Sequence, residues 1–304
     1  MARLVKPGVY KDPHGSLELD PNASYLITGG IGALGLQVAQ YLATNGACHL
    51  VLTGRSGVST DDQRTTLKAL EDAGVKIEVF AADISNEDDV TKVLSSLPNL
   101  RGIVHAAGIL DDGMLMQQSP DRFIKVAGPK VSGAWNLHSQ TLDRPLEFFV
   151  LFSSVASIIG SPGQSNYAAA NAFMDGLAQH RKQQGLVATA INWGPWADVG
   201  MASSDIVLQR LMKDGWQPMN AGQGCNFIGH LLTARDLPQA AVLPIDWGQF
   251  ASNIPGANNW SILSHLVPKE RSSPLLGNAA ELAAQSVKKA LPDQRIDLIS
   301  SYLL

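Results

Sequence analysis

The sequence has little cysteine, few aromatic residues and no long apolar stretch. Its 304 residues include two cysteines, Cys48 and Cys225, and 6% aromatic residues. No apolar run approaches the ~18 residues that a membrane span needs, and the N-terminus MARLVKPGVY lacks the apolar core of a signal peptide. We therefore expect a cytoplasmic protein without membrane contact. Its cysteines are expected to be free, buried thiols, with a disulfide between them as the alternative.

The sequence also lacks a net positive charge and metal-binding patterns. The net charge is -4, so the sequence does not favour nucleic acid as a partner. His49, His138 and His180 have no metal-ligand spacing, and the cysteines add none, so we expect no metal. With 45% hydrophobic residues the chain has ample material for a core.

Short apolar segments alternate with amphipathic ones along most of the chain. Strands are predicted at 24–28, 48–53, 76–80, 101–105, 147–152, 186–192 and 241–245, and helices at 34–44, 61–72, 87–94, within 120–140 and at 165–182. Such alternation predicts an α/β fold, a doubly wound Rossmann-like parallel sheet with helices on both faces. Residues 195–220 interrupt the pattern and predict a helical lid, with a short helix near 206–212.

A glycine-rich turn follows the first predicted strand. Glycines there let the backbone approach a pyrophosphate, and the N-terminus of the next helix offers free N–H groups. A tight turn with close packing and no ligand is the alternative. The residues predicted to contact the cofactor are Thr28, Gly29, Gly30, Ile31, Gly32, Leu34 and Gly35.

The second and third strands indicate which dinucleotide binds. An NAD site usually has an acid after the second strand, but here Arg55 and Ser56 follow it. Arg55 would pair with a 2′-phosphate, which predicts NADPH; a solvated surface arginine is the alternative. Asp83 and Ile84 follow the third strand, where the carboxylate would accept from the adenine amino group or cap the next helix.

Candidate chemical groups follow the fourth and fifth strands. His105, Ala106, Ala107 and Gly108 end the fourth strand and leave room for the cofactor. Ser154 ends the fifth strand, where ligands bind in open α/β sheets. On the following helix, Tyr167 and Asn171 lie four residues apart and therefore on one face.

These segments together resemble a known family. They are TGGIGALG (28–35), TGRSG (53–57), HAAGILDD (105–112), KVSGAWNLH (130–138), FSSVASIIGSPGQSNYAAANAF (152–173) and NWGPWADVGMA (192–202). Over roughly residues 20–250 the chain resembles a short-chain dehydrogenase/reductase, specifically the catalytic half of a ketoreductase domain from a modular polyketide synthase.

The resemblance implies the roles of the site residues. In ordinary short-chain dehydrogenases a lysine stands four residues after the tyrosine, where this chain has Asn171; in the family that it resembles the lysine comes from the preceding helix, here Lys130. Tyr167 would donate the proton, with its pKa lowered by Lys130. Ser154 would bond the carbonyl oxygen, and Asn171 would position Lys130. A packed tyrosine and a capping serine are the alternatives for single residues.

Further motifs imply stereocontrol and the border of the nicotinamide site. Leu110, Asp111 and Asp112 match the family's Leu-Asp-Asp motif, and Ile159 stands where the tryptophan of the opposite handedness would be. A D-configured, usually 3R, hydroxyl is therefore expected, with a solvated turn as the alternative reading. Trp193, Gly194 and Pro195 are expected to border the nicotinamide.

The resemblance also implies domain organisation and partners. Residues 1–23 would join a structural half that the chain lacks, 24–250 would form the catalytic domain, and 251–304 would lead towards a carrier domain. The expected activity is reduction of a β-ketoacyl thioester on an acyl carrier protein. A free ketone or alcohol dehydrogenase and a catalytically silent module are the alternatives.

Overall fold

The fold is described from a computed structural model. It describes residues 3–4, 17–197, 205–233 and 237–267, which fall into two compact units, 1–245 and 246–304. No helix among the described residues is long and apolar enough to cross a membrane.

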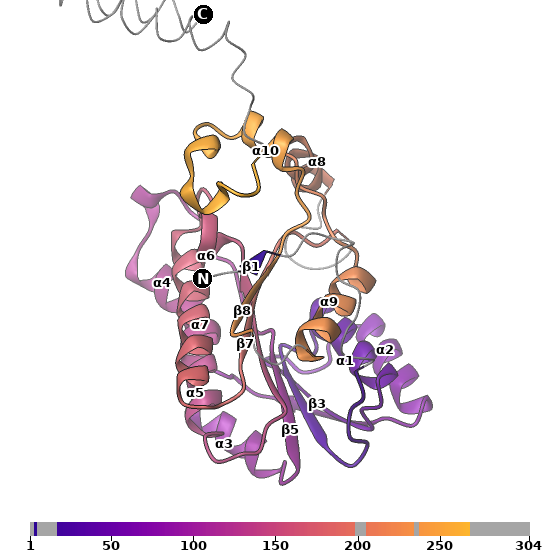
Figure 1. The fold of residues 1–304 in the computed structure, drawn as a ribbon. Helices are drawn as coiled ribbons and strands as arrows, with labels where there is room; N and C mark the ends of the chain where they lie inside the picture. The colour runs from indigo at the N-terminus through magenta and orange to yellow at the C-terminus, as the bar shows by residue number, and fades with distance from the viewer. Residues whose placement is uncertain (1–2, 5–16, 198–204, 234–236, 268–304) are drawn as a thin grey trace, which may run out of the picture. The chain divides into compact units, whose positions relative to one another are not determined.

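The first unit is built on a parallel sheet (Figure 1). Its strand order is β1-β8-β7-β6-β5-β2-β3-β4, with every neighbouring pair parallel. The strands are β1 (Arg3–Leu4), β2 (Ser24–Thr28), β3 (His49–Gly54), β4 (Lys76–Ala81), β5 (Leu100–His105), β6 (Phe148–Ser154), β7 (Thr189–Trp193) and β8 (Gln239–Val242). The order reverses between β2 and β5, which opens a ligand crevice at the carboxyl ends of the strands.

Helices cover both faces of this sheet. In Figure 1, α3, α5 and α7 lie on one side and α1, α2 and α9 on the other. Alternate strand residues feed the two cores, so Tyr25 and Ile27 pack on one face and Leu26 on the other. The helices are α1 (Ala33–Thr44), α2 (Asp61–Asp72), α3 (Glu87–Ser95), α4 (Pro120–Ala127), α5 (Gly133–Ser139), α6 (Ala156–Ile159), α7 (Ser165–Gln183), α8 (Asp205–Lys213) and α9 (Ala221–Thr233).

The predicted fold class is confirmed, with local differences. The last strand spans 239–242 rather than 241–245, and Pro244, which has no N–H to donate to a ladder, follows it. The predicted helical stretch 120–140 divides into α4, the π-helix η2 (Gly128–Ser132) and α5. α8 occupies the helix expected near 206–212, whereas α6, α9 and β1 were not predicted.

The cysteine prediction was half wrong. Both thiols are free, as expected, but only Cys225 is buried, on α9, and Cys48 is exposed. Cys48 stands just before β3, one residue beyond the buried Ala47, so its side chain falls outside the core.

The second unit is small. It contains α10 (Trp247–Asn253) and two 3₁₀ turns, η3 (Ala257–Asn259) and η4 (Ser261–Leu263). The Phe250 ring lies 5.8 Å from that of Trp247 and 6.2 Å from that of Trp260, centroid to centroid. The rest of the predicted carrier-directed segment, residues 268–304, lies outside the described residues, as do 198–204 of the predicted lid and most of 1–16.

Candidate active site

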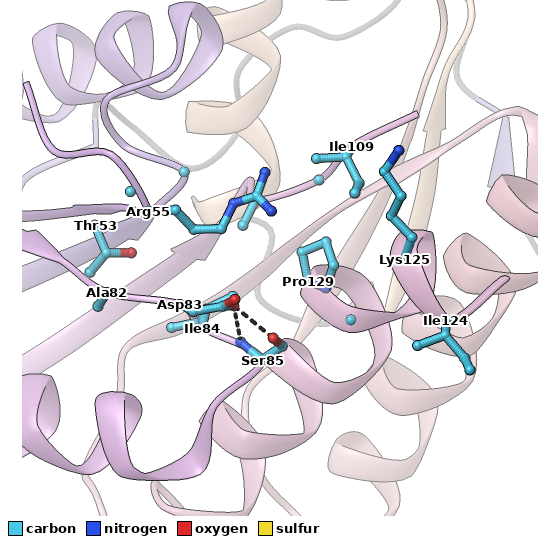
Figure 2. A pocket seen from close by; sticks show the side chains of 15 residues that line it. Thr53, Arg55, Ala82, Asp83, Ile84, Ser85, Ile109, Ile124, Lys125 and Pro129 are labelled. Carbon is cyan, nitrogen blue, oxygen red and sulfur yellow. Dashed lines mark hydrogen bonds between the residues drawn. The ribbon is translucent and has the colours of Figure 1, made fainter. Parts of the chain in front are cut away.

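A cavity of about 360 Å³ opens at the carboxyl ends of β2 to β5. It is lined by residues from four places: the glycine turn, the ends of β3 and β4, the segment after β5, and the junction of α4 with η2. Figure 2 shows Arg55 and Asp83 on one side of it and Ile109, Ile124 and Lys125 on the other. The cavity lies where ligands bind in open α/β sheets.

The glycine turn is shaped for close approach. Gly29 has a φ of 68°, and a Cβ there would lie 2.8 Å from the backbone of Ala107. A Cβ on Gly35 would meet the backbone of Gly29 and Gly30, so α1 packs directly on the turn. Gly32 differs, because a Cβ there would meet only the carbonyl of Gly29, at 3.1 Å.

The N-terminus of α1 is open to an anion. Its N-cap residue, Gly32, offers no side-chain cap, and its first turn has no acidic residue. The backbone N–H groups and the positive end of the helix dipole are therefore available to a phosphate. Thr28, Ile31 and Leu34 hold this turn on the sheet, with Thr28 and Ile31 buried. The turn fits the pyrophosphate of a dinucleotide.

The ends of β3 and β4 supply opposite charges. Arg55 and Ser56 are exposed, and Arg55 lines the cavity without an ion pair to any residue that the structure describes. Asp83 accepts from the backbone N–H of Ser85 at 2.9 Å and from its hydroxyl at 2.6 Å. These bonds, with Arg55 nearby, keep the pKa of Asp83 below its ordinary value. Asn86, not Asp83, caps α3, and Ile84 is buried in the core.

The segment 105–108 closes the floor of the cavity. His105 is buried, and its Nδ1 lies 2.6 Å from the hydroxyl of Thr28, which ties β5 to β2. Burial, helped by the charge of Lys130, lowers the pKa of His105 to about 3, so the ring is neutral. Ala106 donates its N–H to the Thr28 carbonyl, while Ala107 and Gly108 line the cavity. A Cβ on Gly108 would lie 2.9 Å from Cε of Lys130, so glycine leaves room for that side chain.

Lys130, Tyr167 and Asn171 come together as the sequence predicts. Nζ of Lys130 donates to Oδ1 of Asn171 and to the carbonyl of Phe152, both at 3.0 Å. It also lies 5.1 Å from the centroid of the Tyr167 ring. Asn171 donates its amide to the Tyr167 carbonyl at 2.7 Å, which fixes the orientation of the side chain.

The local shape of η2 delivers Lys130. Pro129 has no N–H, so the regular α-helical bonding of α4 cannot continue through it. The chain widens into a π-helix over residues 128–132, and Lys130 within it is only 3% exposed. Single-turn π-helices inside helical segments are frequent at functional sites.

Burial dominates the titration of both groups. It lowers the pKa of Lys130 to about 7, with Asp175 opposing the shift. It also raises the pKa of Tyr167, against hydrogen bonds with Asn171 and Ser154 that lower it, and the Asp112 charge raises it further. The pKa of Tyr167 is therefore raised and not lowered as expected, so the phenol keeps its proton.

The Leu-Asp-Asp segment is anchored rather than solvated throughout. Asp111 pairs with Lys125 at 2.8 Å and with Arg122 at 3.5 Å, and its pKa is lowered, chiefly by the bond from Lys125. Asp112, although exposed, accepts from the Gln164 amide at 3.0 Å. Leu110 packs against the cluster that contains Tyr167. The segment is thus joined to α4 and to the start of α7.

The residues after β7 are held by the backbone and the core. Trp193 is buried between Phe152 and Trp196, with ring centroids 5.4 and 5.0 Å away. Gly194 donates to the Val242 carbonyl, and the Pro195 carbonyl accepts from Met219. Their contact with the nicotinamide stays a prediction.

Comparisons with known proteins agree with this geometry. A family model described as the KR domain matches residues 23–198. The chain is 40% identical over 254 residues to polyketide synthase GfsA of Streptomyces halstedii, covering 83% of this chain and 3% of that protein. It is 37% identical over 268 residues to a phenolphthiocerol/phthiocerol polyketide synthase protein of Mycobacterium tuberculosis, covering 83% of this chain and 12% of that one.

Solved structures give the same picture. A structure of A-type ketoreductases from a modular polyketide synthase matches with a TM-score of 0.73 and 36% identity, over 82% of this chain and 52% of that one. A C2-type ketoreductase matches with a TM-score of 0.70 and 25% identity, over 80% of this chain and 53% of that one. Fold similarity to both types therefore does not assign a type to this chain. The chain spans a small fraction of these synthases and about half of the solved ketoreductases. It belongs to the KR domain family: it is a ketoreductase domain of the polyketide synthase kind, an oxidoreductase with a nicotinamide-binding Rossmann-like fold.

Proposed function

We propose that the chain reduces a β-ketoacyl thioester, carried on an acyl carrier protein, to a β-hydroxyacyl thioester with NADPH. The observation that carries the proposal is the buried contact of Lys130 with Asn171 beside Tyr167, at the edge of a glycine-lined cavity. A structural tyrosine would need no buried lysine beside it, and burying that charge costs free energy.

Each of the chain's own groups has a role in this reduction. The nicotinamide, when bound, supplies a hydride to the carbonyl carbon. Tyr167 holds a proton on its phenol oxygen, because its pKa is raised, and donates it to the carbonyl oxygen. The hydroxyl of Ser154 accepts from the N–H of Ala156 at 3.2 Å. Its own O–H bonds Tyr167 in the free site; with substrate bound, it would donate to the carbonyl oxygen and stabilise the charge that develops there.

Lys130 and Asn171 prepare Tyr167 for this step. The Lys130 ammonium stabilises the phenolate that remains after proton donation, because opposite charges attract strongly in a buried site. Asn171 fixes Lys130 through its side-chain oxygen and fixes itself through the Tyr167 carbonyl. Lys130 would also bind the nicotinamide ribose.

Charge supports NADPH over NADH. Arg55 lies at the end of β3 without an ion pair to a described residue, and no acid stands beside it in the segment 53–57. A guanidinium can bind a 2′-phosphate in a bidentate manner, whereas a carboxylate there would repel it. Asp83 would accept from the adenine amino group.

The carrier-bound substrate rests on the relatives. They are polyketide synthases far longer than this chain, and the chain matches only about half of a solved ketoreductase. We infer an acyl carrier protein and a separate N-terminal structural half as partners. The Leu-Asp-Asp segment, held beside Tyr167 through Leu110, supports a D-configured product.

The test follows NADPH absorbance with a β-ketoacyl thioester and analyses the configuration of the product. We expect oxidation of NADPH and a D-hydroxyl; an L-hydroxyl would refute the stereochemical assignment. Turnover of small ketones alone would support a free dehydrogenase. If no substrate is turned over even with the N-terminal half of a related ketoreductase supplied in trans, the chain is a silent module.

A further inference from the structure

Asp175 lies on α7 behind the candidate catalytic residues. It follows Tyr167 by eight residues and Asn171 by four, so the three side chains lie along one side of the helix. Its carboxylate accepts from the Ser157 hydroxyl at 2.6 Å and from the Asn192 amide at 2.9 and 3.0 Å. A carboxylate with this many donors is rigidly held.

The partners of Asp175 enclose the segment that carries Ser154. The amide of Asn192, on β7, also lies 3.1 Å from the Ser153 hydroxyl and 3.3 Å from the Ser154 carbonyl. The Ser157 hydroxyl lies 2.8 Å from the same Ser154 carbonyl. Asn192 is itself oriented, because its oxygen accepts from Gln239 on β8 at 3.0 Å. The network therefore fixes the Ser154 carbonyl through two donors, Asn192 and Ser157.

Asp175 also supplies the negative charge that acts on Lys130. The titratable neighbours of Lys130 come from two elements. On β5 there is His105, which is neutral; on α7 there are Tyr167, which is protonated, and Asp175, whose negative charge acts on Lys130. Lys130 forms no salt bridge with any described residue; its bonds go to the Asn171 oxygen and the Phe152 carbonyl. A buried ammonium without a counter-charge is costly. The carboxylate of Asp175, on the helix that also carries the Lys130 partner Asn171, offsets part of this cost.

We propose that Asp175 is a positioning residue for the reduction: through Asn192 and Ser157 it holds Ser154 in place, and its charge stabilises the ammonium of Lys130. The inference rests on the roles that the proposed function gives to Ser154 and Lys130. It predicts two separable effects, one on the geometry of Ser154 and one on the protonation of Lys130.

The electrostatic effect is tested without turnover. The ¹³Cε signal of Lys130, identified by its loss in Lys130→Gln, is followed against pH in the wild-type chain and in Asp175→Asn. We expect a midpoint near the wild-type pKa of about 7, and a midpoint about one pH unit lower in the variant. Asp20→Asn makes the same atomic change before the amino end of β2 and leaves the midpoint unchanged. An unchanged midpoint in Asp175→Asn overturns this half of the proposal, whatever the substrate.

Kinetics tests the positioning effect. At pH 8, Asp175→Asn is expected to lose about tenfold or more in kcat, with KM for NADPH nearly unchanged. As the pH is raised, its rate should decline at a lower pH than the wild-type rate, because Lys130 loses its proton at a lower pH. Ser157→Ala keeps the charge, so it should lower kcat while the Lys130 midpoint stays in place. It also serves if Asp175→Asn does not fold. Full kcat in Ser157→Ala, or lower thermal stability in Asp175→Asn with an unchanged pH profile, contradicts the proposal.

Discussion

At the scale of single residues, burial decides the state of the site more than pairing does. Lys130 is almost completely buried and its pKa falls to about 7, while the pKa of Tyr167 rises. Both shifts favour the neutral forms, so the free site holds a protonated phenol beside a lysine close to its titration point. Sequence patterns identify these residue types but not their burial, which depends on the helices that meet around them.

Arg55 gives a prediction at this scale. Arg55→Ala should raise KM for NADPH by roughly tenfold or more and change KM for NADH little, because a charge-assisted bond to the 2′-phosphate is lost. Steady-state kinetics with both cofactors measures this. Arg64→Ala is the matched control: it removes an exposed guanidinium that, among the residues the structure describes, pairs with Asp61 alone. Equal effects on NADPH and NADH would mean that Arg55 does not select the cofactor.

At the scale of elements, the regular strands and helices could be predicted from the sequence, whereas the irregular helix and the long-range hydrogen-bond network could not. The strands, α1 and α7 follow from periodicity, and the Tyr167 to Asn171 spacing follows from α7. The π-helix that carries Lys130 has no periodic signature; Pro129 was its only signal in the sequence. The network of Asp175 and Asn192 was also missed, since it joins α7 to β7 across long sequence separations. The spacing of four residues from Asn171 to Asp175 was the available clue.

The glycine turn separates a folding role from a binding role. Gly35→Ala should lower Tm by several degrees, because a Cβ there collides with the backbone of Gly29 and Gly30. Gly32→Ala should leave Tm within about 2 °C, since its Cβ meets one carbonyl. It should nevertheless weaken NADPH binding about tenfold by crowding the helix N-terminus. Thermal unfolding and a binding titration check the pair; unchanged NADPH affinity in Gly32→Ala would place the pyrophosphate elsewhere.

At the scale of the whole molecule, two buried polar residues brace α5 against α7. Arg181 is 1% exposed, lies 4.0 Å over the Phe149 ring and donates to the Val187 carbonyl at 3.1 Å. Its Nη1 lies 3.1 Å from Nδ1 of His138, which therefore accepts and must be neutral. Burial, together with the charge of Arg181, lowers the pKa of His138 to about 4.

This contact makes stability depend on pH. Between pH 6.5 and about 4 the unfolded chain binds a proton at His138 that the folded chain refuses, so acid favours unfolding. The free energy of unfolding should fall by about 2 kcal/mol between pH 6.5 and 4.5 through His138. His138→Asn keeps an acceptor for Arg181 but does not titrate, so denaturant unfolding should show a shallower acid loss, with the exposed His265→Asn as control. His105 shifts in the same direction and leaves a residual slope.

The most direct test of the account follows hydride and proton delivery together. NADPH carrying deuterium at both C4 positions of the nicotinamide is mixed with a β-ketoacyl thioester, and the product is analysed by mass spectrometry for the wild-type chain and Tyr167→Phe. The account predicts one deuterium at the β-carbon of the hydroxyacyl product with the wild type. Tyr167→Phe should form this product at least ~100-fold more slowly, with its affinity for NADPH retained. Formation of the deuterated product by Tyr167→Phe at the wild-type rate, or a wild-type product without deuterium, would contradict it.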